Sequence, residues 1–117
     1  MKKYEPLKEN RELLHEMANL STRRTGLSSG IIYISNRQGQ HGPRIKFYRK
    51  SAGRTPSTSI SISDSPEIFE DNLSLNRTEK DELFKFVILN REHLLRIWNE
   101  GDTMDIDEWL EGIQSIL

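Results

Sequence analysis

The hydrophobic pattern of this chain changes its period twice, and this change restricts the folds that the chain can form. Apolar residues recur at three- and four-residue steps over residues 6–20, alternate with polar residues between residues 31 and 63, and return to helical steps over residues 79–99. A period of two is typical of strands with one buried face, and a period near 3.6 is typical of amphipathic helices. The order of the segments therefore predicts a helix, then a small sheet, then further helices.

Three strands account for the alternating region. They are predicted over residues 31–35, 43–50 and 57–63, and the segments between them carry glycine, proline and polar side chains. Connections this short favour antiparallel pairing of neighbours. One face of this sheet is apolar and needs cover, because a small sheet alone is only marginally stable in water. The apolar face consists of Ile45, Phe47, Ile60 and Ile62.

The longest helix is predicted over residues 79–99, with Thr78 as its N-cap and Gly101 at its end. Thr103 is expected to cap a last helix, whose apolar stripe runs as far as Leu117. We expect the long helix to cover the sheet and the last two helices to close the core with their tryptophans, Trp98 and Trp109.

The fold class that follows is α+β: a small antiparallel sheet of about three strands covered by a long helix, with an N-terminal helix and a C-terminal helix. A two-layer domain is predicted over residues 31–117. Residues 1–30 are expected to form an N-terminal amphipathic helix and a flexible connection, because residues 21–30 contain two glycines and no hydrophobic period. Residues 67–77 are interpreted as an irregular acidic connection.

Composition excludes several classes of site. The chain has no cysteine, which excludes a disulfide framework, a thiolate metal site and a cysteine nucleophile. It has neither a long apolar run nor the apolar segment of a secretory signal, so we expect a soluble cytoplasmic protein without membrane contact. The three histidines are scattered, and no glycine-rich segment has the spacing of a nucleotide-binding loop. No metal ion and no cofactor is expected.

The charges are divided unevenly along the chain. Residues 1–60 hold twelve Lys and Arg against four Asp and Glu, a net charge of +8, and residues 61–117 hold five against fourteen, a net charge of −9. Halves of opposite sign can attract each other within one fold, or one surface can face an anionic partner. Both interpretations remain open from the sequence.

Cations gather on one side of the predicted strand 43–50. If Ile45 and Phe47 face the core, the alternate residues share the outer face. Cations, hydroxyls and an aromatic ring on a flat sheet can hold a phosphate backbone and stack a base. The main hypothesis is a small non-enzymatic module that binds nucleic acid or a partner protein through this basic sheet face, although a solvated outer face has a similar composition. The candidate nucleic-acid-binding residues are Arg37, Arg44, Lys46, Tyr48, Lys50 and Arg54.

His41 supports an enzymatic alternative. An imidazole close to a guanidinium on a proline corner can serve a phosphodiester as acid or base and hold its charge. The alternative is a metal-independent RNase-like toxin that uses His41, Arg44 and Lys46. The same residues fit an ordinary hairpin turn, so the question of an enzyme stays open, and the sequence favours a role in binding.

The strand 57–63 offers a different kind of surface. It contains no charge, proline or glycine, and an exposed edge of such a strand can pair with a partner protein or with a second copy of the chain. The acidic last helices add a third hypothesis, a protein-only inhibitor or antitoxin-like subunit. The candidate partner-binding residues are Ser57, Ser59, Ser61 and Ser63.

Residues 41–46, the Ser-Ile alternation of residues 59–62 and residues 89–99 together form a pattern. With these segments the chain resembles a group of short uncharacterised bacterial proteins, over about residues 30–117. It is also distantly similar, in its strand-then-helix outline, to a domain-of-unknown-function family found in toxin–antitoxin-like gene pairs. The resemblance implies a bacterial or phage setting and a partner protein, and it carries over no functional residue.

Overall fold

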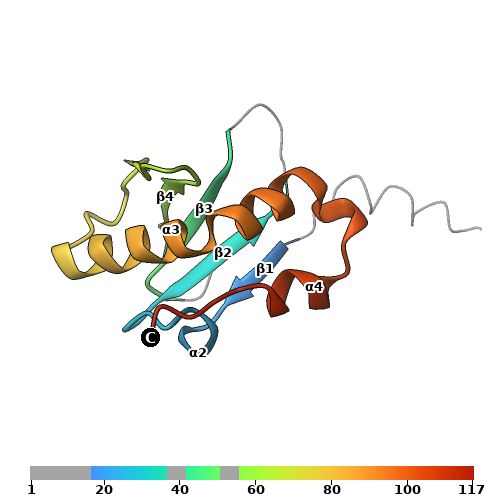
Figure 1. Ribbon diagram of the computed structural model, residues 1–117. Coiled ribbons are helices and arrows are strands. Elements are labelled where there is room, and N and C mark those ends of the chain that lie inside the picture. Colours follow the sequence, from blue (N-terminus) through green and yellow to red (C-terminus); the bar gives the residue numbers. More distant parts are fainter. Residues whose placement is uncertain (1–16, 37–41, 51–55) are drawn as a thin grey trace, which may run out of the picture.

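A computed structural model describes residues 17–36, 42–50 and 56–117 of the chain. Within this part, each strand pairs with the next one along the chain and forms an antiparallel sheet of order β1-β2-β3-β4-β5 (Figure 1). The strands are β1 (Met17–Leu20), β2 (Ile31–Ser35), β3 (Arg44–Tyr48), β4 (Thr58–Ser61) and β5 (Ile68–Phe69). The helices are α2 (Thr22–Thr25), α3 (Arg77–Glu100) and α4 (Ile106–Glu111), with a 3-10 turn at Gly101–Thr103.

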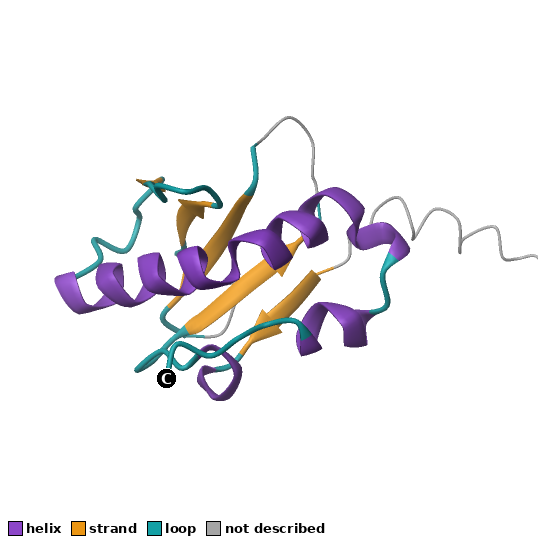
Figure 2. Cartoon of the chain, viewed as in Figure 1, coloured by secondary structure: helices purple, strands orange, loops and turns teal. Residues whose placement is uncertain are grey.

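The predicted fold class is confirmed: an antiparallel sheet is covered on one face by a long helix (Figure 2). The described sheet has five strands, two more than the sequence indicated, and β5 lies within the segment expected to be irregular. The prediction of a helix over residues 6–20 is wrong for its last four residues, which form β1, and residues 6–16 lie outside the described part. Leu20 lies opposite Ile32 and is fully buried, so pairing with β2 overrides the helical spacing.

Residues 21–30 pack against the sheet, where a flexible connection was expected. This segment contains α2 and buries Thr25 and Leu27. Gly30 has a left-handed φ of 92°, and a side chain at this position would overlap the ring of Phe47. The chain therefore passes from β1 to β2 in a fixed turn.

The long helix α3 begins two residues before its predicted start. Asn76 is its N-cap, in place of Thr78, and forms a capping box: the Asn76 side chain accepts from the Glu79 amide, and Glu79 accepts from the Asn76 amide. Gly101 ends the helix, as predicted. The buried side of α3 packs on the apolar face formed by Ile45, Phe47, Ile60 and Ile62, all of which are buried as expected.

The two tryptophans are both buried, and Trp109 belongs to the main hydrophobic core. Its indole N–H donates to the Gly101 carbonyl at 3.3 Å. The last helix is shorter than predicted: Asp105 caps it in place of Thr103, and it ends at Glu111. Leu117 is therefore not part of a buried helical stripe and is 99% exposed.

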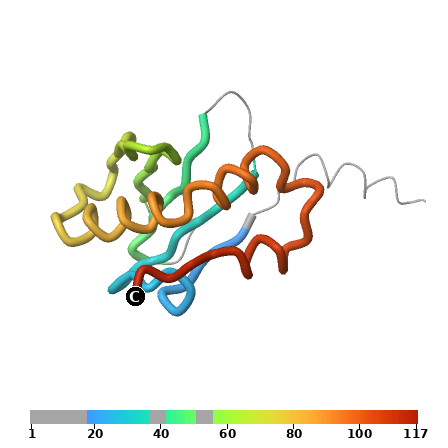
Figure 3. Tube along the Cα trace, viewed as in Figure 1, coloured from blue at the N-terminus to red at the C-terminus, as the bar shows by residue number. Residues whose placement is uncertain are grey.

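After α4, residues 112–117 run back beside α3 towards α2 (Figure 3). The buried Asn90 side chain donates to the Gln114 carbonyl at 3.0 Å and accepts from the Gln114 amide at 2.7 Å. The Ile116 amide donates to the Thr25 carbonyl at 2.9 Å. These bonds hold the segment against both helices.

Candidate nucleic-acid interface

The helices α3 and α4 lie on the same face of the sheet (Figures 1 and 2). We call the opposite face the outer face. The strand register sets Asn19 beside Tyr33, Tyr33 beside Lys46, Lys46 beside Ser59 and Ser59 beside Phe69, so one row crosses all five strands of the described sheet. The outer face comprises this row with Ile31, Ser35, Arg44, Tyr48 and Ser61.

Lys46 lies in the middle of the outer face, between Tyr33 and Ser59. It is half-buried, and its ammonium makes no hydrogen bond or ion pair with the residues that the structure describes. A partly desolvated cation that forms no ion pair within the described residues attracts an anion more strongly than a fully solvated lysine does.

Two tyrosines stand next to this lysine. The rings of Tyr33 and Tyr48 meet edge to face, with centroids 6.1 Å apart, and Tyr48 is only 8% exposed. Burial, together with the nearby Tyr48, raises the pKa of Tyr33 above its usual value.

Arg44 shares the outer face as predicted, but its charge is already engaged. Its guanidinium lies over the Phe69 ring, 5.3 Å from the centroid, and forms an ion pair with Glu70 at 3.3 Å. The Arg44 side chain is 11% exposed. Ser59 Oγ also donates to Glu70 at 3.3 Å. Arg44 therefore ties β3 to the end of β5.

The other predicted cations are distributed differently. Lys50 follows β3 and is exposed. Arg37, Arg54 and the catalytic candidate His41 lie outside the described residues, so the RNase hypothesis stays a prediction.

Arg49, which the sequence did not single out, points to the helix side. Its guanidinium donates two hydrogen bonds of 2.9 Å to Glu79 at the start of α3. This bond lowers the pKa of Glu79 below its usual value against an opposing effect of burial, and the Asn76 amide lowers it further. Arg49 joins the sheet to the helix and is not part of the outer face.

Of the four predicted partner-binding serines, Ser59 and Ser61 belong to β4, an interior strand of the described sheet, and Ser57 and Ser63 flank it. Ser59 faces Phe69 of β5 and is almost fully buried. The Ser61 amide donates to the Glu67 carbonyl, and the Ser61 hydroxyl accepts from the Glu67 amide, both at 2.9 Å. Ser57 and Ser63, at the two ends, are half-buried. A partner strand at Ser59 and Ser61 would have to displace β5.

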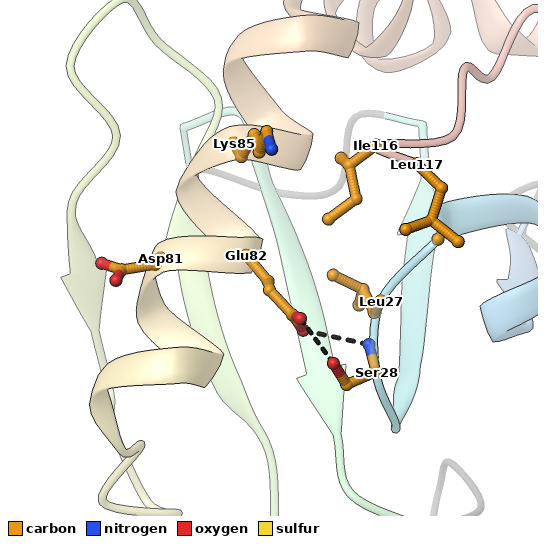
Figure 4. A pocket seen from close by; sticks show the side chains of 8 residues that line it. Leu27, Ser28, Asp81, Glu82, Lys85, Ile116 and Leu117 are labelled. Carbon is orange, nitrogen blue, oxygen red and sulfur yellow. Dashed lines mark hydrogen bonds between the residues drawn. The ribbon is translucent and has the colours of Figure 1, made fainter.

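A shallow depression of about 410 Å³ lies between α3 and the turn that follows α2 (Figure 4). The Glu82 carboxylate on its wall accepts from the Ser28 amide at 3.0 Å and from the Ser28 hydroxyl at 2.6 Å. Both oxygens of this acid therefore hold the turn after α2 against α3.

Among residues 17–36, 42–50 and 56–117, no three histidine, aspartate or glutamate side chains come together as metal ligands. None of the helices in these ranges combines the length and apolar character that a membrane crossing requires. His93 is instead hydrogen-bonded to the Trp109 carbonyl at 2.8 Å.

Comparison with models of protein families, with curated protein sequences and with solved structures finds no match. The chain forms a small α+β globule, and its candidate site rests on the geometry of the outer face.

Proposed function

We propose that the chain binds single-stranded nucleic acid through the outer face of its sheet. The observation that carries the proposal is the cross-strand pair Tyr33 and Lys46, which sets an aromatic ring beside a cation. The ring and the ammonium match the base and the phosphate of one nucleotide. A flat sheet face suits an unpaired strand, whose bases are free to turn towards it.

Lys46 contributes the electrostatic part of this binding. It has no acidic partner within the described residues, so a phosphate would meet an uncompensated positive charge. Exposed Lys50, two residues beyond the end of β3, extends the positive surface along the strand direction. Arg44 contributes less, because Glu70 already compensates its charge.

Tyr33 contributes the aromatic part. The Tyr48 ring packs against it at an interplanar angle of 81°, which limits its motion. A base stacked on a tyrosine ring gains roughly 1–3 kcal/mol of binding free energy. The interface consists of one stacking ring and few phosphate contacts. We therefore expect weak binding with little sequence preference.

The test compares two charge reversals of equal size. Lys46→Glu alters the outer face, and Lys80→Glu alters an exposed lysine on α3, on the other side of the sheet. Both variants change the net charge by −2. Binding of each protein to a labelled single-stranded RNA and to duplex DNA is measured by fluorescence anisotropy across a salt series.

We expect the wild type and Lys80→Glu to bind the single strand alike, and Lys46→Glu to lose binding at every salt concentration. With Lys46 and Lys50 as the phosphate contacts, the slope of log K against log salt is about −1.4. Equal loss in both reversals would mean that only net charge matters, and no binding at low salt would contradict the proposal and favour a protein partner.

A further inference from the structure

The side of α3 that points away from the sheet carries ten exposed residues in one stripe. The residues buried by α3 lie on its opposite side, and Figures 1 and 3 show the sheet on that side only. At 3.6 residues per turn, the stripe spans about 140° of the helix surface. Two of its residues, Thr78 and Asn99, are polar and uncharged. We call the eight charged and apolar residues of the stripe the α3 ridge: Arg77, Asp81, Lys85, Ile88, Leu89, Glu92, Arg96 and Glu100.

The α3 ridge is symmetric about the midpoint between Ile88 and Leu89. Lys85 and Glu92 are equally far from this midpoint and have opposite charges. The same relation holds for Asp81 with Arg96, and again for Arg77 with Glu100. The two central residues are apolar although their positions are exposed, Ile88 by 56% and Leu89 by 43%.

We infer that the α3 ridge is the interface of a homodimer in which two copies of α3 pack antiparallel. A two-fold axis through the midpoint brings Ile88 and Leu89 of both copies together. Each of the three oppositely charged pairs then forms twice, so six ion pairs flank an apolar centre. This interface lies on the other side of the domain from the outer face and is independent of the proposed nucleic-acid binding.

The charges also exclude other arrangements of the two helices. Parallel packing would set each charged residue against its own copy. An antiparallel slip of four residues in one direction brings Lys85 opposite Arg96 and Asp81 opposite Glu100. The slip in the other direction places Asp81 opposite Glu92. Both slipped arrangements therefore place like charges opposite one another, which disfavours them.

The charged groups of the α3 ridge are available for this contact. Within the described residues, the side chains of Arg77, Asp81, Lys85 and Glu92 make no ion pair or hydrogen bond of their own. Arg96 has only a long contact of 3.9 Å with Glu100, and both side chains are more than half exposed. Dimerisation therefore breaks no strong intramolecular pair.

The test is a charge swap, followed by sedimentation velocity of the full chain at about 50 mM salt, where ion pairs are weakly screened. Lys85→Glu and Glu92→Lys each set like charges opposite one another twice, and each should weaken the dimer about tenfold or more. The double variant Lys85→Glu/Glu92→Lys restores opposite charges and should dimerise like the wild type. Lys80→Glu, exposed on α3 but outside the α3 ridge, is the control and should have no effect.

A second measurement reads the orientation of the helices. The chain has no cysteine, so an introduced one is unique. In the inferred dimer, the two copies of residue 88 lie about 1.5 Å apart along the helix axis, and the two copies of residue 81 lie about 22 Å apart. Oxidation should crosslink Ile88→Cys and leave Asp81→Cys uncrosslinked.

Three results would overturn the inference. A wild-type chain that stays monomeric at every concentration has no such interface. A double variant that stays monomeric as the single variants do rules out the pairing of Lys85 with Glu92. Crosslinking of Asp81→Cys in preference to Ile88→Cys shows that the helices are not antiparallel about the inferred midpoint.

Discussion

Replacing Asn90 by alanine tests how residues 112–117 are held to the domain. Asn90 lies in the middle of α3 and is 2% exposed. Its side-chain amide makes two hydrogen bonds to the Gln114 backbone, and its Nδ2 also donates to the Phe86 carbonyl at 3.0 Å. In Asn90→Ala, the amide and carbonyl of Gln114 lose their partners.

The expected cost follows from these contacts. Each lost hydrogen bond to Gln114 removes about 1 kcal/mol, and a backbone group left unpaired in a partly buried place adds to this. We expect the free energy of unfolding to fall by about 2–3 kcal/mol. Asn99→Ala is the matched control, because Asn99 also donates to a carbonyl four residues earlier, at 3.0 Å, but is exposed. Its cost should stay below about 0.5 kcal/mol, since alanine is the better helix former.

Urea unfolding gives the free energies, and amide hydrogen exchange reports the segment directly. In Asn90→Ala, the amides of Gln114 and Ile116 should exchange faster than in the wild type, because the segment opens without global unfolding. The same amides should be unchanged in Asn99→Ala. Equal stability losses in the two variants, or unchanged protection of the Gln114 amide, would refute the reasoning.

Three further predictions concern pH, packing and catalysis. The folded state lowers the pKa of Glu79 through its pairing with Arg49. The stabilisation from this pairing is fully present above the pKa of Glu79 in the unfolded chain and is lost as pH falls through its pKa in the folded chain. Glu79→Gln should therefore flatten this part of the curve of unfolding free energy against pH, measured by urea unfolding. In Gly112→Ala, the new Cβ overlaps the His93 ring, so the free energy of unfolding in urea should fall by about 1–3 kcal/mol. Adding His93→Ala to Gly112→Ala should recover part of this free energy. For a binding module we expect no cleavage of labelled RNA in the presence of a chelator, whereas cleavage that His41→Ala abolishes would favour the RNase alternative.

The elements that the sequence predicted well are those with a long and regular pattern. The strands β2, β3 and β4 alternate clearly, and α3 repeats its apolar positions over six turns. The short edge strands β1 and β5 were missed, because four and two residues are too few to define a period and their hydrogen bonds come from neighbours.

The candidate site was predictable in part for the same reason. Alternation within one strand is enough to set Arg44, Lys46 and Tyr48 on one face. Tyr33 was missed as a neighbour of Lys46, because that relation depends on the register between β2 and β3. The engagement of Arg44 by Glu70 depends on β5 and has no local signal in the sequence.

The most direct test of the proposed binding surface is a map of the nucleic-acid contact on the folded chain. A uniformly labelled protein is titrated with a short single-stranded oligonucleotide, and the backbone amide shifts are followed by NMR. We expect the largest changes at Tyr33 and Lys46, and small changes along α3. Changes centred on α3 or α4, or no changes at low salt, would contradict the assignment of the outer face as the binding surface.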